Sequence, residues 1–157
     1  MNGKYVGGFI VLTALIGGAA IYWLQEYAYY REVAFQPGQG ISLTLVDGGG
    51  VEPMLADNLS GIDADSSPLR FRACFDTPTS LATLTETYLI YDAPAPTIAP
   101  GWFTCFDAKT IGAALEAGQA LAFLSQAAIA PGIDRVVAVF PDGSAYAWHQ
   151  LSPAAEN

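Results

Sequence analysis

The chain has 157 residues, which is enough for one compact domain of ordinary size and little more. Fifteen acidic residues against six basic ones give a formal net charge of -9. This balance argues against a nucleic-acid-binding protein, because such proteins need clustered lysine and arginine. Hydrophobic residues make up 52% of the chain, and the longest uncharged run lies close to the N-terminus.

Residues 5–24 carry no charge and predict one transmembrane helix. At about 1.5 Å per residue, a helix of this length spans the roughly 30 Å hydrocarbon layer of a bilayer. Aromatic rings with a polar group are favoured where the membrane meets water. Residues 1–30 are therefore interpreted as a membrane anchor, with interface residues at its far end: Tyr22, Trp23, Tyr27, Tyr29 and Tyr30.

The charges that flank this helix predict its orientation. Lys4 precedes it, whereas residues 26–32 together hold one net negative charge. The positive-inside rule then places the N-terminus in the cytoplasm and the rest of the chain in the periplasm of a bacterial inner membrane. A cleaved signal peptide is the alternative, since Gly18 and Ala20 are small enough for a cleavage site, although the length of the uncharged run favours an anchor.

Small residues recur along the predicted helix and suggest a face for packing against another membrane helix. The pairs Thr13 with Gly17 and Ala14 with Gly18 are four residues apart, which permits close helix contact. The alternative is that glycine is simply frequent in membrane helices. The candidate helix-packing residues are Gly7, Gly8, Thr13, Ala14, Gly17 and Gly18.

The rest of the chain predicts a connector over residues 31–40, an α+β domain over 41–152 and a tail over 153–157. Alternating apolar and polar residues, with glycine-rich turns, predict strands at 41–46, 69–75, 135–140 and 144–151, the last two as a hairpin. Residues 57–67 look like a polar loop, and the prolines of 93–101 predict an extended crossing loop.

Two helices complete the predicted domain. One covers residues 80–88 and is capped by Asp76 or Thr77; the other covers 110 to about 126 and is capped by Asp107. The expected fold is a small mixed or antiparallel sheet of about four or five strands with both helices on one face.

The two cysteines predict a disulfide, because the expected topology places both outside the reducing cytoplasm. Cys74 and Cys105 lie in two similar stretches, Cys-Phe-Asp in each case, 31 residues apart. A redox-active or metal-transfer pair is the alternative, although the chain has no Cys-x-x-Cys motif, and two free thiols are the third possibility.

No residue pattern predicts catalysis, a cofactor or a metal site. His149 is the single histidine, so it has no second imidazole with which to build a metal or haem site, and no nucleophile motif accompanies it. A satisfied or solvent-facing histidine is expected instead. The acidic domain favours basic partners such as a c-type cytochrome, or the charge serves solubility alone.

Three features of the sequence resemble a family of small uncharacterised single-pass membrane proteins of alphaproteobacteria. They are the opening Met1-Asn2-Gly3-Lys4, the apolar run that ends in Tyr22-Trp23-Leu24-Gln25-Glu26-Tyr27-Ala28-Tyr29-Tyr30, and the paired Cys-Phe-Asp elements. Some members are labelled histidine kinases, but this chain has no phosphoacceptor region and no ATP-binding glycine boxes. The resemblance implies a bacterial inner-membrane protein and supplies no catalytic residues.

Together these features predict a non-catalytic accessory or assembly subunit of a larger membrane complex, with a respiratory terminal oxidase as the class to test first. The alternative is a membrane-tethered periplasmic thiol or metal-transfer protein that uses Cys74 and Cys105.

Overall fold

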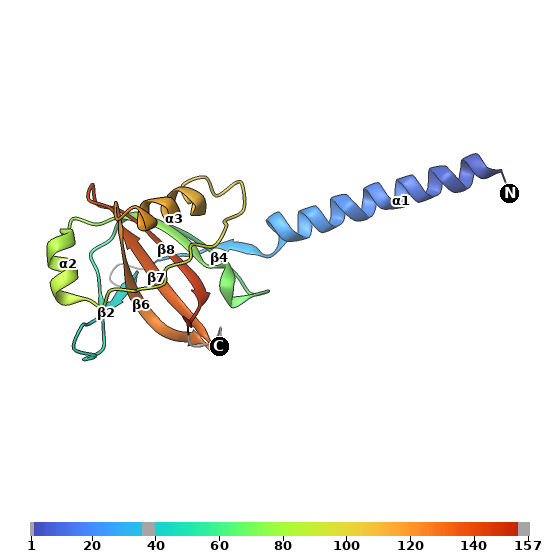
Figure 1. The fold of residues 1–157 in the computed structure, drawn as a ribbon. Helices are drawn as coiled ribbons and strands as arrows, with labels where there is room; N and C mark the ends of the chain where they lie inside the picture. Colours follow the sequence, from blue (N-terminus) through green and yellow to red (C-terminus); the bar gives the residue numbers. More distant parts are fainter. Residues whose placement is uncertain (1, 36–39, 154–157) are drawn as a thin grey trace.

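A computed structural model describes residues 2–35 and 40–153. Helix α1 (Gly3–Trp23) projects away from a domain built on an antiparallel sheet (Figure 1). The domain contains two further helices and ends in a pair of antiparallel strands. The predicted fold class, an apolar N-terminal helix followed by an α+β domain, is confirmed.

Helix α1 forms because its sequence is apolar and contains no proline, and it continues into one π-helical turn (Leu24–Ala28). None of its residues is buried in the described part of the chain. Tyr29 alone separates this turn from strand β1 (Tyr30–Glu32), which pairs with the main sheet. The prediction of a connector over residues 31–40 was therefore wrong at its start, and residues 36–39 lie outside the described residues.

The main sheet has six strands in the order β1-β4-β5-β8-β7-β6, and every neighbouring pair is antiparallel. Its other strands are β4 (Asp57–Ala64), β5 (Arg72–Asp76), β6 (Leu121–Ala130), β7 (Ile133–Val139) and β8 (Ser144–Leu151). Strands β2 (Ser42–Thr44) and β3 (Val51–Pro53) form a separate two-stranded sheet. A short 3-10 helix (Pro68–Arg70) precedes β5.

The predicted C-terminal hairpin is present as β7 and β8. Val139 lies opposite Ala145, and the backbone N–H of Phe140 donates to the oxygen of Ser144 across the turn. Gly143 has φ of +91°, and a Cβ at this position would lie 2.8 Å from the backbone oxygen of Thr77. The turn therefore requires glycine both for its backbone conformation and for the approach of Thr77.

The predicted polar loop at residues 57–67 was wrong, because residues 57–64 form strand β4. Ile62 and Ala64 are buried, and β4 pairs with β1 on one side and β5 on the other. These backbone hydrogen bonds come from strands distant in sequence, so the polar composition of the segment does not reveal them.

The predicted helix at 110–126 was wrong in its second half, because α3 (Ala108–Glu116) ends early. Gly118, at φ +67°, donates its N–H to Leu115, and Gln119 donates to Ala114. This is the Schellman pattern that terminates a helix at glycine. The following residues 121–124 are apolar and pair with β7 as the start of β6.

The helix caps agree with the sequence in one case and differ in the other. Asp107 caps α3 by accepting hydrogen bonds from the N–H groups of Lys109 and Thr110, as predicted. Helix α2 (Leu81–Thr87) is capped by Ser80, whose hydroxyl accepts from the N–H of Thr83. The proposed caps Asp76 and Thr77 lie too early, because α2 begins only after Ser80.

The buried residues of α2 and α3 pack on opposite faces of the main sheet, which corrects the prediction that both helices lie on one face. Leu84 of α2 belongs to one cluster and Ile111 of α3 to the other. Successive residues of a strand point to opposite faces, so strands such as β5, β7 and β8 supply both clusters. In β8, Ala145 and Ala147 face the α2 side and Trp148 faces the α3 side.

Candidate functional site

Helix α1 and its aromatic end form the first candidate site. The helix and its π-helical turn, 26 residues in all, are long and apolar enough to cross a membrane. The predicted interface residues Tyr22, Trp23 and Tyr27 lie together, with the Trp23 and Tyr27 ring centroids 5.1 Å apart in a stacked arrangement. Tyr29 is exposed beside them, and Tyr30 belongs to β1.

The domain contacts this aromatic end through Trp102, a residue that the sequence analysis did not select. Its indole Nε1 donates a hydrogen bond of 2.6 Å to the backbone oxygen of Glu26. Its ring stacks on Tyr27 at 6.4 Å and meets Tyr30 edge-on at 5.9 Å. Nothing local in the sequence signals this role, because it depends on contacts between residues about 75 positions apart.

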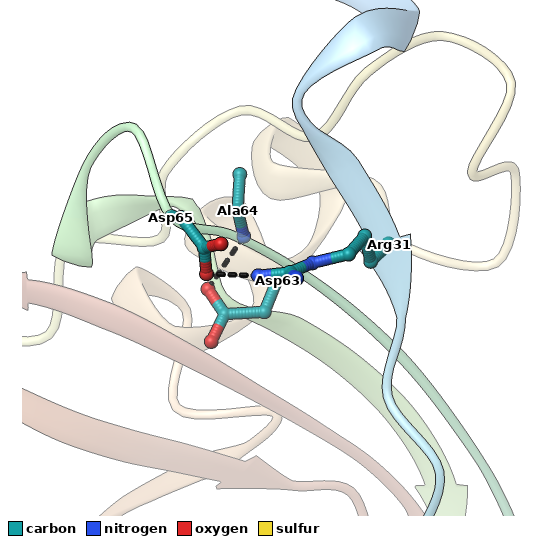
Figure 2. Close-up of polar contacts among 4 residues, drawn as sticks. All are labelled: Arg31, Asp63, Ala64 and Asp65. Carbon is teal, nitrogen blue, oxygen red and sulfur yellow. Dashed lines mark hydrogen bonds and ion pairs between the residues drawn. The ribbon is translucent and has the colours of Figure 1, made fainter.

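Two further groups attach the domain to the helix end. Arg70 donates to the backbone oxygen of Gln25 at 3.3 Å, and its guanidinium lies over the ring of Tyr30 at 5.2 Å. The N–H of Gly101 donates to the Glu26 carboxylate at 3.3 Å. Nearby, Arg31 of β1 forms an exposed ion pair with Asp65, shown in Figure 2.

A buried arginine holds the proline-rich crossing loop against the sheet. Arg72 is only 4% exposed and donates to four backbone oxygens, those of Leu69, Phe71, Thr97 and Ile98, at 2.5–3.0 Å. Burial lowers its pKa to about 10, and its guanidinium faces the ring of Phe106. Among the described residues it forms no ion pair, so four carbonyl dipoles surround its charge, and the more distant carboxylate of Asp63 also favours the charged form.

His149 is buried and fully hydrogen-bonded, in agreement with the expectation of a satisfied histidine. Its Nδ1 lies 2.6 Å from the oxygen of Pro68, and its Nε2 lies 2.9 Å from Nε of Arg135. Since a carbonyl only accepts and a guanidinium only donates, Nδ1 holds the proton and Nε2 accepts. Burial, opposed by the Pro68 contact and assisted by Arg135 and Arg72, lowers the pKa to about 4, which keeps the imidazole neutral.

Cys74 and Cys105 form a disulfide that ties β5 to the loop before α3. Cys74 is 9% exposed, whereas Cys105 is exposed and lies two residues before the cap of α3. The bond borders a hollow of about 290 Å³ whose wall includes Ser60, Asp76 and Tyr146. Cys105 therefore lies on the solvent side of the bond and Cys74 on the core side.

A larger hollow of about 740 Å³ lies between the proline-rich loop and α3. Its wall is mostly alanine and proline, with Asp92, Lys109 and Glu116 as the charged residues. In the described part of the chain, no hydrogen bond or ion pair joins these three charged side chains to one another. In that part of the chain, no group of three or more His, Cys, Asp and Glu side chains is placed to hold a metal ion.

Residues 41–157 match the model of one protein family, described as a family of unknown function (DUF6446). The chain belongs to this family. The DUF6446 match begins at the residue before β2 and includes the disulfide, α2, α3 and the C-terminal hairpin, whereas α1 and β1 precede it. No curated protein and no solved structure matches the chain.

Proposed function

We propose that this DUF6446 protein is a non-catalytic accessory or assembly subunit of a larger membrane complex in the inner membrane of an alphaproteobacterium. Helix α1 crosses the membrane once, with the N-terminus in the cytoplasm and the sheet domain in the periplasm. A respiratory complex such as a terminal oxidase is the class of partner to test first.

The glycines of α1 are the observation that supports a membrane partner most directly. A Cβ added at Gly7, Gly17 or Gly18 would meet no atom of the described chain within 4 Å. Each glycine costs a helix up to about 1 kcal/mol relative to alanine, yet no residue in the described part of the chain fills the space that it leaves. A second helix packed closely on this face would use that space.

The six candidate packing residues do not all share one face. At about 100° per residue, Gly7, Ala14 and Gly18 fall on one side of α1, with Gly17 about 80° from the centre of that face. Gly8 lies about 100° and Thr13 about 120° from the centre, on opposite sides and off that face. The proposed contact therefore uses Gly7, Ala14 and Gly18, with Gly17 at its margin.

The disulfide and the charge distribution support the proposed topology. A formed disulfide is typical of an oxidising compartment such as the periplasm. From Glu32 onward the chain has fourteen acidic and four basic residues, a net charge of -10. Such a domain attracts basic partners over a distance, and a cationic electron carrier such as a c-type cytochrome fits this chemistry.

Co-purification from native membranes tests the proposal. The tagged full-length chain, extracted in mild detergent, is expected to bring down an integral membrane complex in fixed stoichiometry, identified by mass spectrometry. Ala14→Leu should weaken this association, because the larger side chain fills the proposed contact face. The matched control is Ala19→Leu, the same substitution about 140° around the helix. Recovery of the wild-type chain alone would overturn the proposal.

A second candidate function, a membrane-tethered thiol or metal-transfer protein, is favoured by the exposure of Cys105 beside a hollow. In this function a partner thiolate would attack the sulfur of Cys105, form a mixed disulfide with it and release Cys74 as the thiolate. Alkylation of the native protein, followed by mass spectrometry, separates the two functions. Labelled cysteines under mild reduction support thiol exchange, whereas a bond that resists reduction removes the main support for it.

A further inference from the structure

The sheet domain is joined to α1 without a free linker. One residue, Tyr29, separates the π-helical turn from β1, and β1 pairs with β4 so that Tyr30 lies opposite Ala64. This short junction, together with the bonds from Arg70, Gly101 and Trp102 to the helix end, holds the domain in one orientation relative to that end. If α1 crosses a membrane, the same end of the domain always faces that membrane.

Register identifies which end of the sheet this is. Ala64 of β4 lies at the α1 end, whereas Asp57, at the other end of the same strand, pairs with Asp76. Seven steps of a strand at about 3.3 Å each separate the two ends by roughly 23 Å. The loop of residues 98–102 lies at the α1 end, because its Gly101 and Trp102 contact Glu26 (Figure 1).

This loop presents apolar side chains outward. Ile98 is 83% exposed and Trp102 is 37% exposed, whereas Phe103 is buried in the domain. The backbone of the loop is held at two points: the carbonyl oxygen of Ile98 accepts from Arg72, and the N–H of Gly101 donates to the Glu26 carboxylate. Because the loop backbone is held in place, the loop cannot rearrange to bury the side chain of Ile98. This side chain therefore stays exposed unless something outside the domain covers it.

We infer that the loop of residues 98–102 is a second membrane contact, which lies in the phospholipid interface of the bilayer that α1 crosses. This inference rests on the proposed membrane topology of α1. Trp102 extends the aromatic group of Trp23 and Tyr27 beyond the helix, and Ile98 enters the boundary of the acyl chains. Arg70, bonded to Gln25, stands at the level of the lipid phosphates.

A lipid interface matches the chemistry of these residues. Tryptophan is favoured there because its ring is apolar while its indole N–H remains hydrogen-bonded, and the Trp102 N–H bonds to Glu26. The contact is also continuous with the helix end, since the ring of Trp102 stacks directly on Tyr27. The two contacts together hold the domain against the membrane in one orientation.

Quenching of tryptophan fluorescence by brominated lipids tests the inference on the full-length chain in phosphatidylcholine vesicles. Trp148 is fully buried and gives a constant background. The difference between Trp23→Phe and the Trp23→Phe/Trp102→Phe double variant isolates Trp102, and the difference between Trp102→Phe and the same double variant isolates Trp23. We expect bromines high on the acyl chains to quench both residues, and bromines near the bilayer centre to quench Trp102 less.

The outcomes distinguish this inference from the topology on which it rests. Quenching of Trp23 without quenching of Trp102 overturns the loop contact, whether water or a protein covers the loop, and leaves the topology intact. Quenching of neither residue overturns both.

A matched pair of serine variants adds a second readout that does not alter Trp102. Ile98→Ser in the Trp23→Phe background should reduce the quenching of Trp102, because it removes the apolar side chain that enters the bilayer. Leu55→Ser removes an apolar side chain that is 68% exposed and lies near the far end of β4, two residues before Asp57, so it should change nothing. Equal quenching in the two variants would contradict the role of Ile98.

Discussion

The guanidinium Nε of Arg135 donates a hydrogen bond to Nε2 of His149 at 2.9 Å, while the other ring nitrogen of His149 faces the oxygen of Pro68 at 2.6 Å. The ring of Phe71 contacts both residues: it stacks on the His149 imidazole and lies under the Arg135 guanidinium. A second proton on His149 would break its bond from Arg135 and place two positive charges together. The folded state therefore requires a neutral histidine.

This requirement predicts that stability falls as the pH falls. The pKa of His149 is near 6.5 in the unfolded chain and about 4 in the folded one, so between these values only the unfolded chain binds the proton. The free energy of unfolding should be constant above pH 6.5 and should drop by roughly 3 kcal/mol between pH 6.5 and about pH 4. Urea unfolding in mild detergent at several pH values measures it.

The control for this pH dependence is His149→Gln, which removes the titrating group. The chain has no other histidine, so in the variant the free energy of unfolding should change much less between pH 6.5 and about 4.5. Asp107 and Asp142, whose pKa values are lowered by hydrogen bonds from Thr110 and Ser144, contribute only at lower pH. A slope that persists unchanged in His149→Gln would contradict the assignment.

Arg72→Met should cost far more stability than the same change at Arg31. Methionine fills a similar volume but leaves four backbone oxygens without a donor inside the domain, so we expect a loss of about 3 kcal/mol. The side chain of Arg31 is 66% exposed and pairs with an exposed carboxylate on Asp65, so Arg31→Met should cost less than about 1 kcal/mol. Urea unfolding of both variants compares them, and equal losses would contradict the proposed role of Arg72.

The fold could be predicted wherever one stretch of sequence contains the whole signal. The hairpin of β7 and β8 is such a case, because two apolar runs flank an Asp-Gly turn, and α1 is another. Strand β4 could not be predicted, since its polar residues form a strand only because β1 and β5 pair with it. Helix α3 was extended too far because the glycine that ends it, Gly118, is followed by an apolar run that suits either a helix or a strand.

The candidate site was predictable only in part for the same reason. The aromatic residues Tyr22, Trp23 and Tyr27 are close in sequence, and their common location follows from the helix. Trp102 and Arg72 act on partners 25 or more residues away, at Glu26 and Thr97, and no local pattern marks them. Sequence periodicity reports which side of an element is buried, but it does not report which distant loop that side meets.

Gly143→Ala and Gly112→Ala should change stability in opposite directions. At Gly143 the backbone has φ of +91° and a Cβ would lie 2.8 Å from the oxygen of Thr77, so alanine should cost roughly 2 kcal/mol. Gly112 lies inside α3, where a Cβ would approach only Pro96, at 4.0 Å, so alanine should stabilise by up to about 1 kcal/mol. Thermal unfolding of the two variants checks the sign, and destabilisation by both would contradict the geometry of α3.

Removal of the disulfide should lower the stability of the domain while leaving its fold intact. The bond closes a loop with a sequence separation of 31 residues, for which the chain-entropy model gives about 3.7 kcal/mol. The Cys74→Ser/Cys105→Ser double variant should lose this amount in urea unfolding, and the reduced wild-type chain should match it, because both lack the same restraint on the unfolded state. If the double variant is as stable as the oxidised wild type, the bond has no structural role. In that case the exposure of Cys105 would favour a role of the cysteines in thiol exchange rather than a structural disulfide.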